Sequence, residues 1–115
     1  MTSDSVPTLT VADLPTEPAD GVVLLDVREQ DEWDAGHAPG ALHIPMGELP
    51  ARLADLPADS ALHVVCRGGG RSARATAYLN ANGWDAHNVD GGMKAWHAAG
   101  RPMESAGAAT PPQVI

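Results

Sequence analysis

The chain has 115 residues and a formal net charge of −8, with 15 Asp and Glu side chains against seven Lys and Arg. This length suits a single domain. The acidic balance argues against nucleic acid and anionic membranes as partners, because both require a clustered basic face. A single cysteine excludes an internal disulfide and any zinc site built from paired cysteines, so we expect no metal and no cofactor. The N-terminus lacks the features of a secretory signal, which predicts a cytoplasmic location.

Short apolar runs alternate along the chain with segments of helical character. This pattern predicts strands over residues 8–11, 21–27, 41–45, 61–66 and 85–89, and helices over 29–36, 46–57, 72–83 and 92–100. Alternating β and α elements indicate an α/β domain with a mostly parallel sheet. We expect residues 8–103 to form this domain, 1–7 to be a flexible N-terminus and 104–115 to be a disordered tail, since the tail shows no periodicity.

The second predicted helix, 46–57, is amphipathic. Leu49, Leu53 and Leu56 fall on one helical face, which predicts that this face packs on the core. Pro50 fits an α-helix only within the first turn, because proline has no backbone N–H to donate. The other three predicted helices end at glycines 36, 83 and 100, which are natural helix terminators.

The only cysteine, Cys66, ends a predicted central strand and precedes three glycines. Ligands bind at the carboxyl ends of strands in open parallel sheets. The glycines let backbone N–H groups turn inward as an anion nest, and Arg67, Arg71 and the next helix N-terminus add positive charge. Such surroundings lower a thiol pKa from about 8.5. We therefore predict a Cys66 thiolate at neutral pH, although a lone cysteine at a strand end is often only a small buried apolar residue.

Three stretches of the chain resemble signatures of the rhodanese-like sulfurtransferases. "CRGGGRS" resembles the active-site loop C-R-x-G-x-R-[ST], "DVREQDEWDAGHAPGALHIP" is similar to the upstream signature, and "GWDAHNVDGGMKAWHAAGRP" looks like the C-terminal one. The one mismatch is Ala38, where isoleucine is common. The resemblance runs from about residue 8 to 103 and implies a three-layer α/β fold in which helices flank a central, mostly parallel sheet.

The resemblance also implies an activity. Cys66 would take a sulfane sulfur from a donor such as thiosulfate and pass it, as a persulfide, to a thiophilic acceptor such as a thiol, cyanide or a protein. Arginine beside the cysteine resembles the loops that use thiosulfate rather than mercaptopyruvate. Cationic side chains and backbone N–H groups would bind the donor and hold the persulfide charge. The predicted substrate-binding residues are Arg67, Gly68, Gly69, Gly70, Arg71 and Ser72.

Two charged residues at the end of the first long strand are candidates for supporting the loop. Asp26 either pairs with Arg71 or is an ordinary turn residue. Arg28 belongs to the same signature, and its spacing to Glu32 is also that of an i,i+4 pair on a solvated helix face. The remaining signature residues are expected to be structural: His37, Trp33 and Trp96.

Two other functions fit a cysteine in an anion-binding loop. Cysteine phosphatases and arsenate reductases use such a loop, but phosphatases place five residues between Cys and Arg, whereas four separate Cys66 from Arg71. A non-enzymatic persulfide carrier or a regulatory module on the same fold is the second alternative. The sequence gives no indication that separates a slow enzyme from a carrier, and none of the oligomeric state.

Overall fold

The computed structural model describes residues 6–15, 19–106 and 111–115, and a parallel five-stranded sheet forms its centre. The strand order is β1-β5-β4-β2-β3, so β4 is the central strand and the short β1 and β3 lie at the edges. Every neighbouring pair is parallel, as the alternation of elements predicts. The strands are β1 (Thr8–Leu9), β2 (Val22–Asp26), β3 (Leu42–His43), β4 (Ala61–Val65) and β5 (Asp85–Val89).

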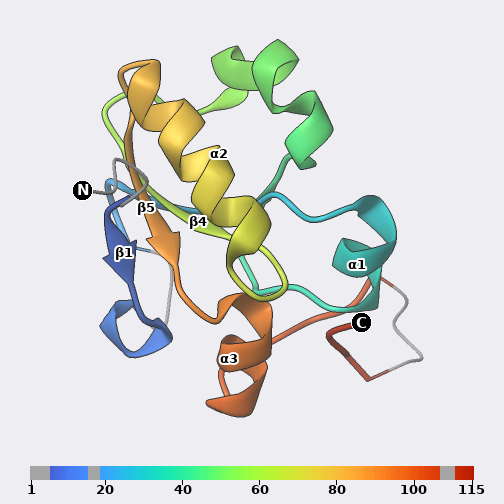
Figure 1. The fold of residues 1–115 in the computed structure, drawn as a ribbon. Helices are drawn as coiled ribbons and strands as arrows, with labels where there is room; N and C mark the ends of the chain where they lie inside the picture. Colours follow the sequence, from blue (N-terminus) through green and yellow to red (C-terminus); the bar gives the residue numbers. More distant parts are fainter. Residues whose placement is uncertain (1–5, 16–18, 107–110) are drawn as a thin grey trace.

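Helical segments cover both faces of the sheet and make three layers (Figure 1). On one face, Leu62 and Val64 of β4 pack with Leu49 and Leu79. On the other face, Val65 packs with residues of η1 and α3. The predicted three-layer α/β fold is confirmed. The helical segments are η1 (Val11–Asp13), α1 (Gln30–Ala35), η2 (Met46–Asp55), α2 (Gly70–Ala81) and α3 (Gly92–Ala98).

The segment predicted as a helix over residues 46–57 forms 3-10 turns instead of an α-helix. Arg52 has non-helical angles, φ −118° and ψ 19°, which divide η2 into two short pieces, and Pro50 lies inside it rather than in its first turn. A proline at this place cannot donate a helical hydrogen bond, and 3-10 runs are usually short. The predicted apolar face is nevertheless correct, because Leu49 and Leu56 are buried and Leu53 packs against the same core.

The described parts of the C-terminal tail, residues 104–106 and 111–115, return to the domain. The rest of the segment that we expect to be disordered, residues 107–110, lies outside the described residues, as do residues 1–5 of the N-terminus that we expect to be flexible. His37 and Glu104 exchange two backbone hydrogen bonds of 2.8 and 2.9 Å, and the Gln113 N–H donates to Ala35 O at 2.8 Å. Gly36 is needed at this crossing, because a Cβ there would collide with the Gln113 carbonyl oxygen. The two crossings are backbone hydrogen bonds, which leave no periodic pattern in the sequence.

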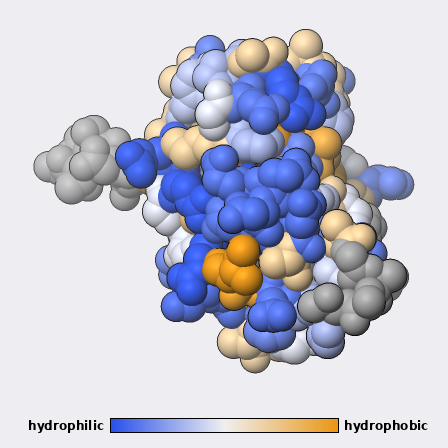
Figure 2. Space-filling view, turned by 90° about the vertical axis from the view of Figure 1, so that its right-hand side faces the viewer, coloured by the Kyte–Doolittle hydropathy of each residue, from blue (hydrophilic) through white to orange (hydrophobic). Residues whose placement is uncertain are grey.

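The side of the molecule that carries α1 and the C-terminus is mostly hydrophilic (Figure 2). Apolar residues form small separate areas on this face, whereas docking surfaces usually carry a larger contiguous patch. Among the described residues, none of the helices is long and apolar enough to cross a bilayer.

Candidate active site

Cys66 follows directly after the central strand β4 and is 1% exposed. The chain then turns through residues 67–69 and enters α2 at Gly70. Gly69 has a φ of +117°, a left-handed conformation that L side chains rarely adopt, so glycine is required where the loop becomes a helix. The strand, the loop and the helix start follow one another as the sequence predicts.

Hydrogen-bond donors converge on the Cys66 sulfur. The Gly69 N–H donates to Sγ at 3.0 Å, and the Ser72 hydroxyl lies 3.3 Å from the same atom. Burial raises the pKa of the Cys66 thiol. Hydrogen bonds from the Ser72 hydroxyl and from the backbone N–H groups of Ser72, Gly69 and Gly68 lower this pKa, and together they outweigh the effect of burial. The net effect is a pKa below the usual range, in the predicted direction. The loop is therefore a cup that favours a thiolate.

The N-terminus of α3 is hydrogen-bonded to the backbone of this cup. The Met93 and Lys94 N–H groups donate to the carbonyl oxygens of Cys66 and Arg67 at 2.8 and 3.0 Å. Gly92 permits this approach, because a Cβ there would collide with Cys66 O and would lie 2.7 Å from Arg67 O. Sequence reasoning assigned Gly92 no role in the site. A Gly-Gly pair directly before a helix is the signal that indicates such a close approach.

Arg71 is bound by a carboxylate that the sequence analysis assigned elsewhere. Its Nη1 and Nη2 atoms donate to Oε1 and Oε2 of Glu32 at 2.7 and 2.8 Å. The hydrogen bond from Arg71 lowers the pKa of Glu32 to about 2, although burial opposes this shift, and Glu32 in turn raises the pKa of Arg71. The predicted pair of Asp26 with Arg71 is wrong, and Glu32 is joined to Arg71 rather than to Arg28 on a solvated face.

Asp26 and Arg28 instead form a fully buried ion pair with each other. Arg28 Nη2 donates to Asp26 Oδ2 at 2.8 Å and to Gly36 O at the same distance, and both side chains are 0% exposed. A buried charge requires a partner, and the carboxylate two residues earlier in the chain satisfies this requirement. The pair ties the end of β2 to the end of α1, the helix that carries Glu32.

The other two arginines of the loop region are exposed. Arg67 lies at the rim of the cup, where its Nε donates to Ile115 O at 2.9 Å, and Arg74 lies on the surface of α2. Gly68 and Gly70 are also exposed, and a Cβ on either would meet no atom within 4 Å. The rim therefore combines one cationic side chain with open space beside the loop.

Comparison with known proteins identifies the family. A family model described as "Rhodanese-like domain" matches residues 10–99. The chain belongs to this family. YtwF of Bacillus subtilis is 38% identical over 86 residues, which are 75% of this chain and 84% of that protein. A protein of Allochromatium vinosum named "Sulfurtransferase" is 39% identical over 83 residues, which are 71% of this chain and 78% of that protein. The crystal structure of a rhodanese-related protein from Thermoplasma volcanium has a TM-score of 0.79 at 33% identity and covers 85% of this chain and 97% of that one.

One polar residue of this rhodanese-like site was not selected from the sequence. Asn88 of β5 is 6% exposed, and its Oδ1 lies 2.6 Å from the Ser72 hydroxyl oxygen. Strand β5 neighbours β4, and Val64 is the register partner of Asn88. Asparagine is depleted in β-strands, so its place in the predicted strand 85–89 is the signal that could have identified it.

The aromatic residues of the rhodanese-like signatures make ring-stacking contacts and a hydrogen bond within the domain. The Trp33 ring stacks on His37 and His43 with ring centroids 3.7 and 4.7 Å apart. Trp96 is 4% exposed and donates from Nε1 to Pro102 O at 2.8 Å. These contacts agree with the expectation that Trp33, His37 and Trp96 shape the domain.

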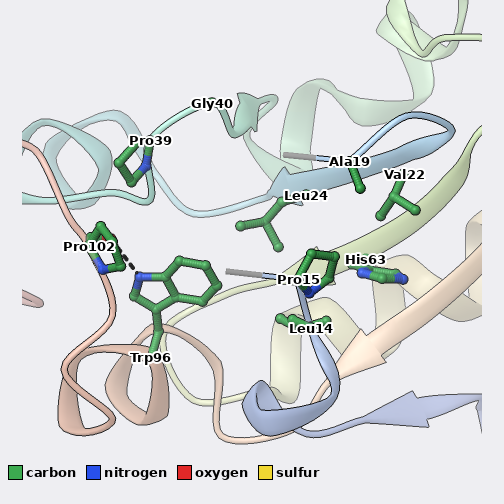
Figure 3. Close-up of a pocket in the computed structure, with 10 residues that line it drawn as sticks. All are labelled: Leu14, Pro15, Ala19, Val22, Leu24, Pro39, Gly40, His63, Trp96 and Pro102. Carbon is green, nitrogen blue, oxygen red and sulfur yellow. Dashed lines mark hydrogen bonds between the residues drawn. The ribbon is translucent and has the colours of Figure 1, made fainter. Parts of the chain in front are cut away.

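A separate cavity of about 270 Å³ lies in the rhodanese-like domain away from the Cys66 loop (Figure 3). Its lining is mostly apolar and includes Leu24 and Trp96, and residues 66–72 do not contribute to it. His63 is its titratable lining residue, and burial, followed by the neighbouring His87, lowers the pKa of His63. The cavity and the thiolate cup are therefore different sites.

Proposed function

We propose that this rhodanese-like protein transfers a sulfane sulfur from thiosulfate, or a similar anionic donor, to a thiophilic acceptor through a persulfide on Cys66. The observation that carries the proposal is the cup itself, in which Gly69 N–H and Ser72 Oγ lie 3.0 and 3.3 Å from Sγ. Preorganised donors of this kind stabilise negative charge on an atom without further rearrangement. A relative that is named a sulfurtransferase supports the assignment of this chain to the transferases.

The first half-reaction loads the sulfur. The Cys66 thiolate attacks the outer sulfur of thiosulfate, a bond forms between Sγ and that sulfur, and the sulfur–sulfur bond of thiosulfate breaks with its electron pair leaving on sulfite. The product is a persulfide anion, so one negative charge stays in the cup. The N–H groups of the loop hold that charge, and no general base is needed, because no proton moves.

The second half-reaction unloads the sulfur. An acceptor such as cyanide or a thiolate attacks the outer sulfur of the persulfide, and the electron pair of the broken bond returns to Cys66 Sγ as thiolate. Both half-reactions bring two anions together. Positive charge at the rim lowers that repulsion, and exposed Arg67 is placed to supply it. Arg71 contributes less free charge than the sequence suggests, because Glu32 binds both of its terminal nitrogens.

Intact-protein mass measurement tests the proposal directly. Incubation with thiosulfate should add one sulfur atom to the protein, and cyanide should remove it with release of thiocyanate. Cys66 is the only cysteine in the chain, so Cys66→Ser should abolish both events without another thiol taking over. Turnover by Cys66→Ser would reject the mechanism. Loading without appreciable steady-state turnover would favour a persulfide carrier instead of an enzyme.

A further inference from the structure

The Ser72 hydroxyl is surrounded by more acceptors than it has protons. Its Oγ lies 3.3 Å from Cys66 Sγ, 3.2 Å from Gly69 O and 2.6 Å from Asn88 Oδ1. A serine hydroxyl donates one hydrogen bond and accepts two. If the Asn88 oxygen faces Ser72, this shortest contact takes the proton, and the Cys66 sulfur receives none from Ser72.

A half-turn of the Asn88 carboxamide resolves this competition. The turn exchanges the oxygen and the amide nitrogen, which occupy nearly the same volume, and leaves every other atom in place. Asn88 Nδ2 then donates to Ser72 Oγ, and the hydroxyl proton is free to point at Cys66. A hydrogen bond to an ionised acceptor is roughly twice as strong as one between neutral groups. The thiolate therefore favours this arrangement over the one in which Ser72 donates to Asn88.

Burial makes the arrangement rigid. Ser72, Cys66 and Asn88 are 0%, 1% and 6% exposed. Asn88 is fixed in β5 between two neighbouring strands, with its backbone N–H donating to Pro7 O at 2.7 Å. Electrostatic interactions among buried polar groups are stronger than the same interactions in water.

We propose that Asn88 is a positioning residue that directs the Ser72 hydroxyl proton onto the sulfur of Cys66, in the thiolate and in the persulfide. The part of this inference that concerns sulfur transfer rests on the proposed function. The part that concerns the thiolate does not, because it is measured on the unloaded protein.

The pH dependence of Cys66 alkylation by iodoacetamide tests the inference. Ser72→Ala should raise the midpoint by about one pH unit, because it removes a charge-assisted hydrogen bond to the thiolate. Asn88→Ala should raise the midpoint by less, because Ser72 keeps its proton but is free to turn it toward Gly69 O. The double variant should show the shift of Ser72→Ala alone, because Asn88 acts only through Ser72. Additive shifts, or an unchanged midpoint in folded Asn88→Ala, would overturn the inference. A loss of sulfur transfer with wild-type alkylation behaviour would instead concern the proposed function.

Asn80 provides a matched control. Its side chain also bridges α2 and β5, through hydrogen bonds of 3.0 and 2.8 Å to the backbone of Ala86. Asn80→Ala should cost stability and leave the Cys66 midpoint unchanged. A shift of the Cys66 midpoint in these variants reports the hydrogen bond, because none of them changes a charged residue around the cup. Those charged residues are Asp26, Arg28, Glu29, Glu32, Arg67, Arg71, Asp90 and Lys94.

A measurement on the wild-type protein covers the case in which Asn88→Ala does not fold. The side-chain amide protons of Asn88, assigned by their absence from Asn88→Asp, should shift in NMR spectra with the same midpoint as the Cys66 thiol. Resonances that stay constant across the Cys66 titration would overturn the inference.

Discussion

Arg71 of α2 and Glu32 of α1 are joined by two hydrogen bonds of 2.7 and 2.8 Å across 39 positions of sequence. The pair connects the start of the helix that follows the cysteine loop to a helix that follows β2. Two parallel bonds fix orientation as well as distance. Arg71 therefore holds the wall of the cup in place and has less charge available for a donor.

Replacing Arg71 with Ala should lower kcat/KM for thiosulfate by about tenfold, since part of the loop placement and a positive charge near the sulfur are lost. Part of this loss should fall on kcat. Glu32→Ala combined with Arg71→Ala should be no slower than Arg71→Ala alone, because Glu32 acts through Arg71. Arg74→Ala, an exposed arginine on the same helix, is the matched control and should leave the kinetics unchanged. A double variant slower than Arg71→Ala would show that Glu32 has a role apart from Arg71, and a change confined to KM would show that Arg71 only attracts the donor.

The Glu32–Arg71 pair should also make the free energy of unfolding depend on pH in the acid range. The pKa of Glu32 is about 2 in the folded protein against an ordinary value of 4.5. Between these values the unfolded chain binds a proton that the folded protein does not, so the stabilisation is present above pH 4.5 and is lost as pH falls toward 2. Glu32→Gln removes this contribution.

Urea unfolding at a series of pH values measures this effect. The free energy of unfolding of the wild-type protein should fall more steeply than that of Glu32→Gln within this window, and the two curves should converge at its acid end. Parallel wild-type and Glu32→Gln curves would contradict the prediction.

The sequence predicts the position of Cys66 well but not the ion pairs around it. An apolar run, a cysteine and a glycine loop before a helix are local signals, and they place the thiol at the end of β4. The partner of Arg71 is a long-range choice between Asp26, which ends β2, and Glu32, which lies in α1. The geometry of the turn after β2 decides it, because Arg28 folds back onto Asp26 and leaves Glu32 for Arg71. The spacing of these residues in the sequence does not predict the geometry of this turn.

Gly92→Ala should destabilise the protein by about 3 kcal/mol. The added methyl group would clash with the Cys66 carbonyl oxygen, and the alanine would have to keep a left-handed backbone conformation. The φ of Gly92 is +54°, and its contacts are backbone atoms that cannot move aside alone. Chemical denaturation measures the loss. Gly47→Ala is the control, because a Cβ there meets no atom within 4 Å. Equal stability of the two variants would show that α3 is not packed on the cysteine loop.

The length of the cysteine loop should discriminate sulfur from phosphate. Arg71 follows Cys66 after four residues, and Ser72 stands where cysteine phosphatases have arginine. The short loop brings Gly69 N to 3.0 Å and Ser72 Oγ to 3.3 Å from Sγ. We expect a loop this tight to accept one outer sulfur more readily than a tetrahedral phosphate or arsenate. Arg71, bound to Glu32, does not offer its fork to a phosphate.

We therefore expect no measurable hydrolysis of aryl phosphates under conditions where sulfur transfer from thiosulfate is readily seen. Insertion of one glycine between Gly70 and Arg71 restores the phosphatase spacing. It should weaken sulfur transfer, because it displaces Ser72 from the sulfur and Arg71 from Glu32, and any phosphate or arsenate chemistry should stay slow. Robust phosphatase activity of the unmodified protein that depends on Cys66 would reject the sulfur-transfer assignment.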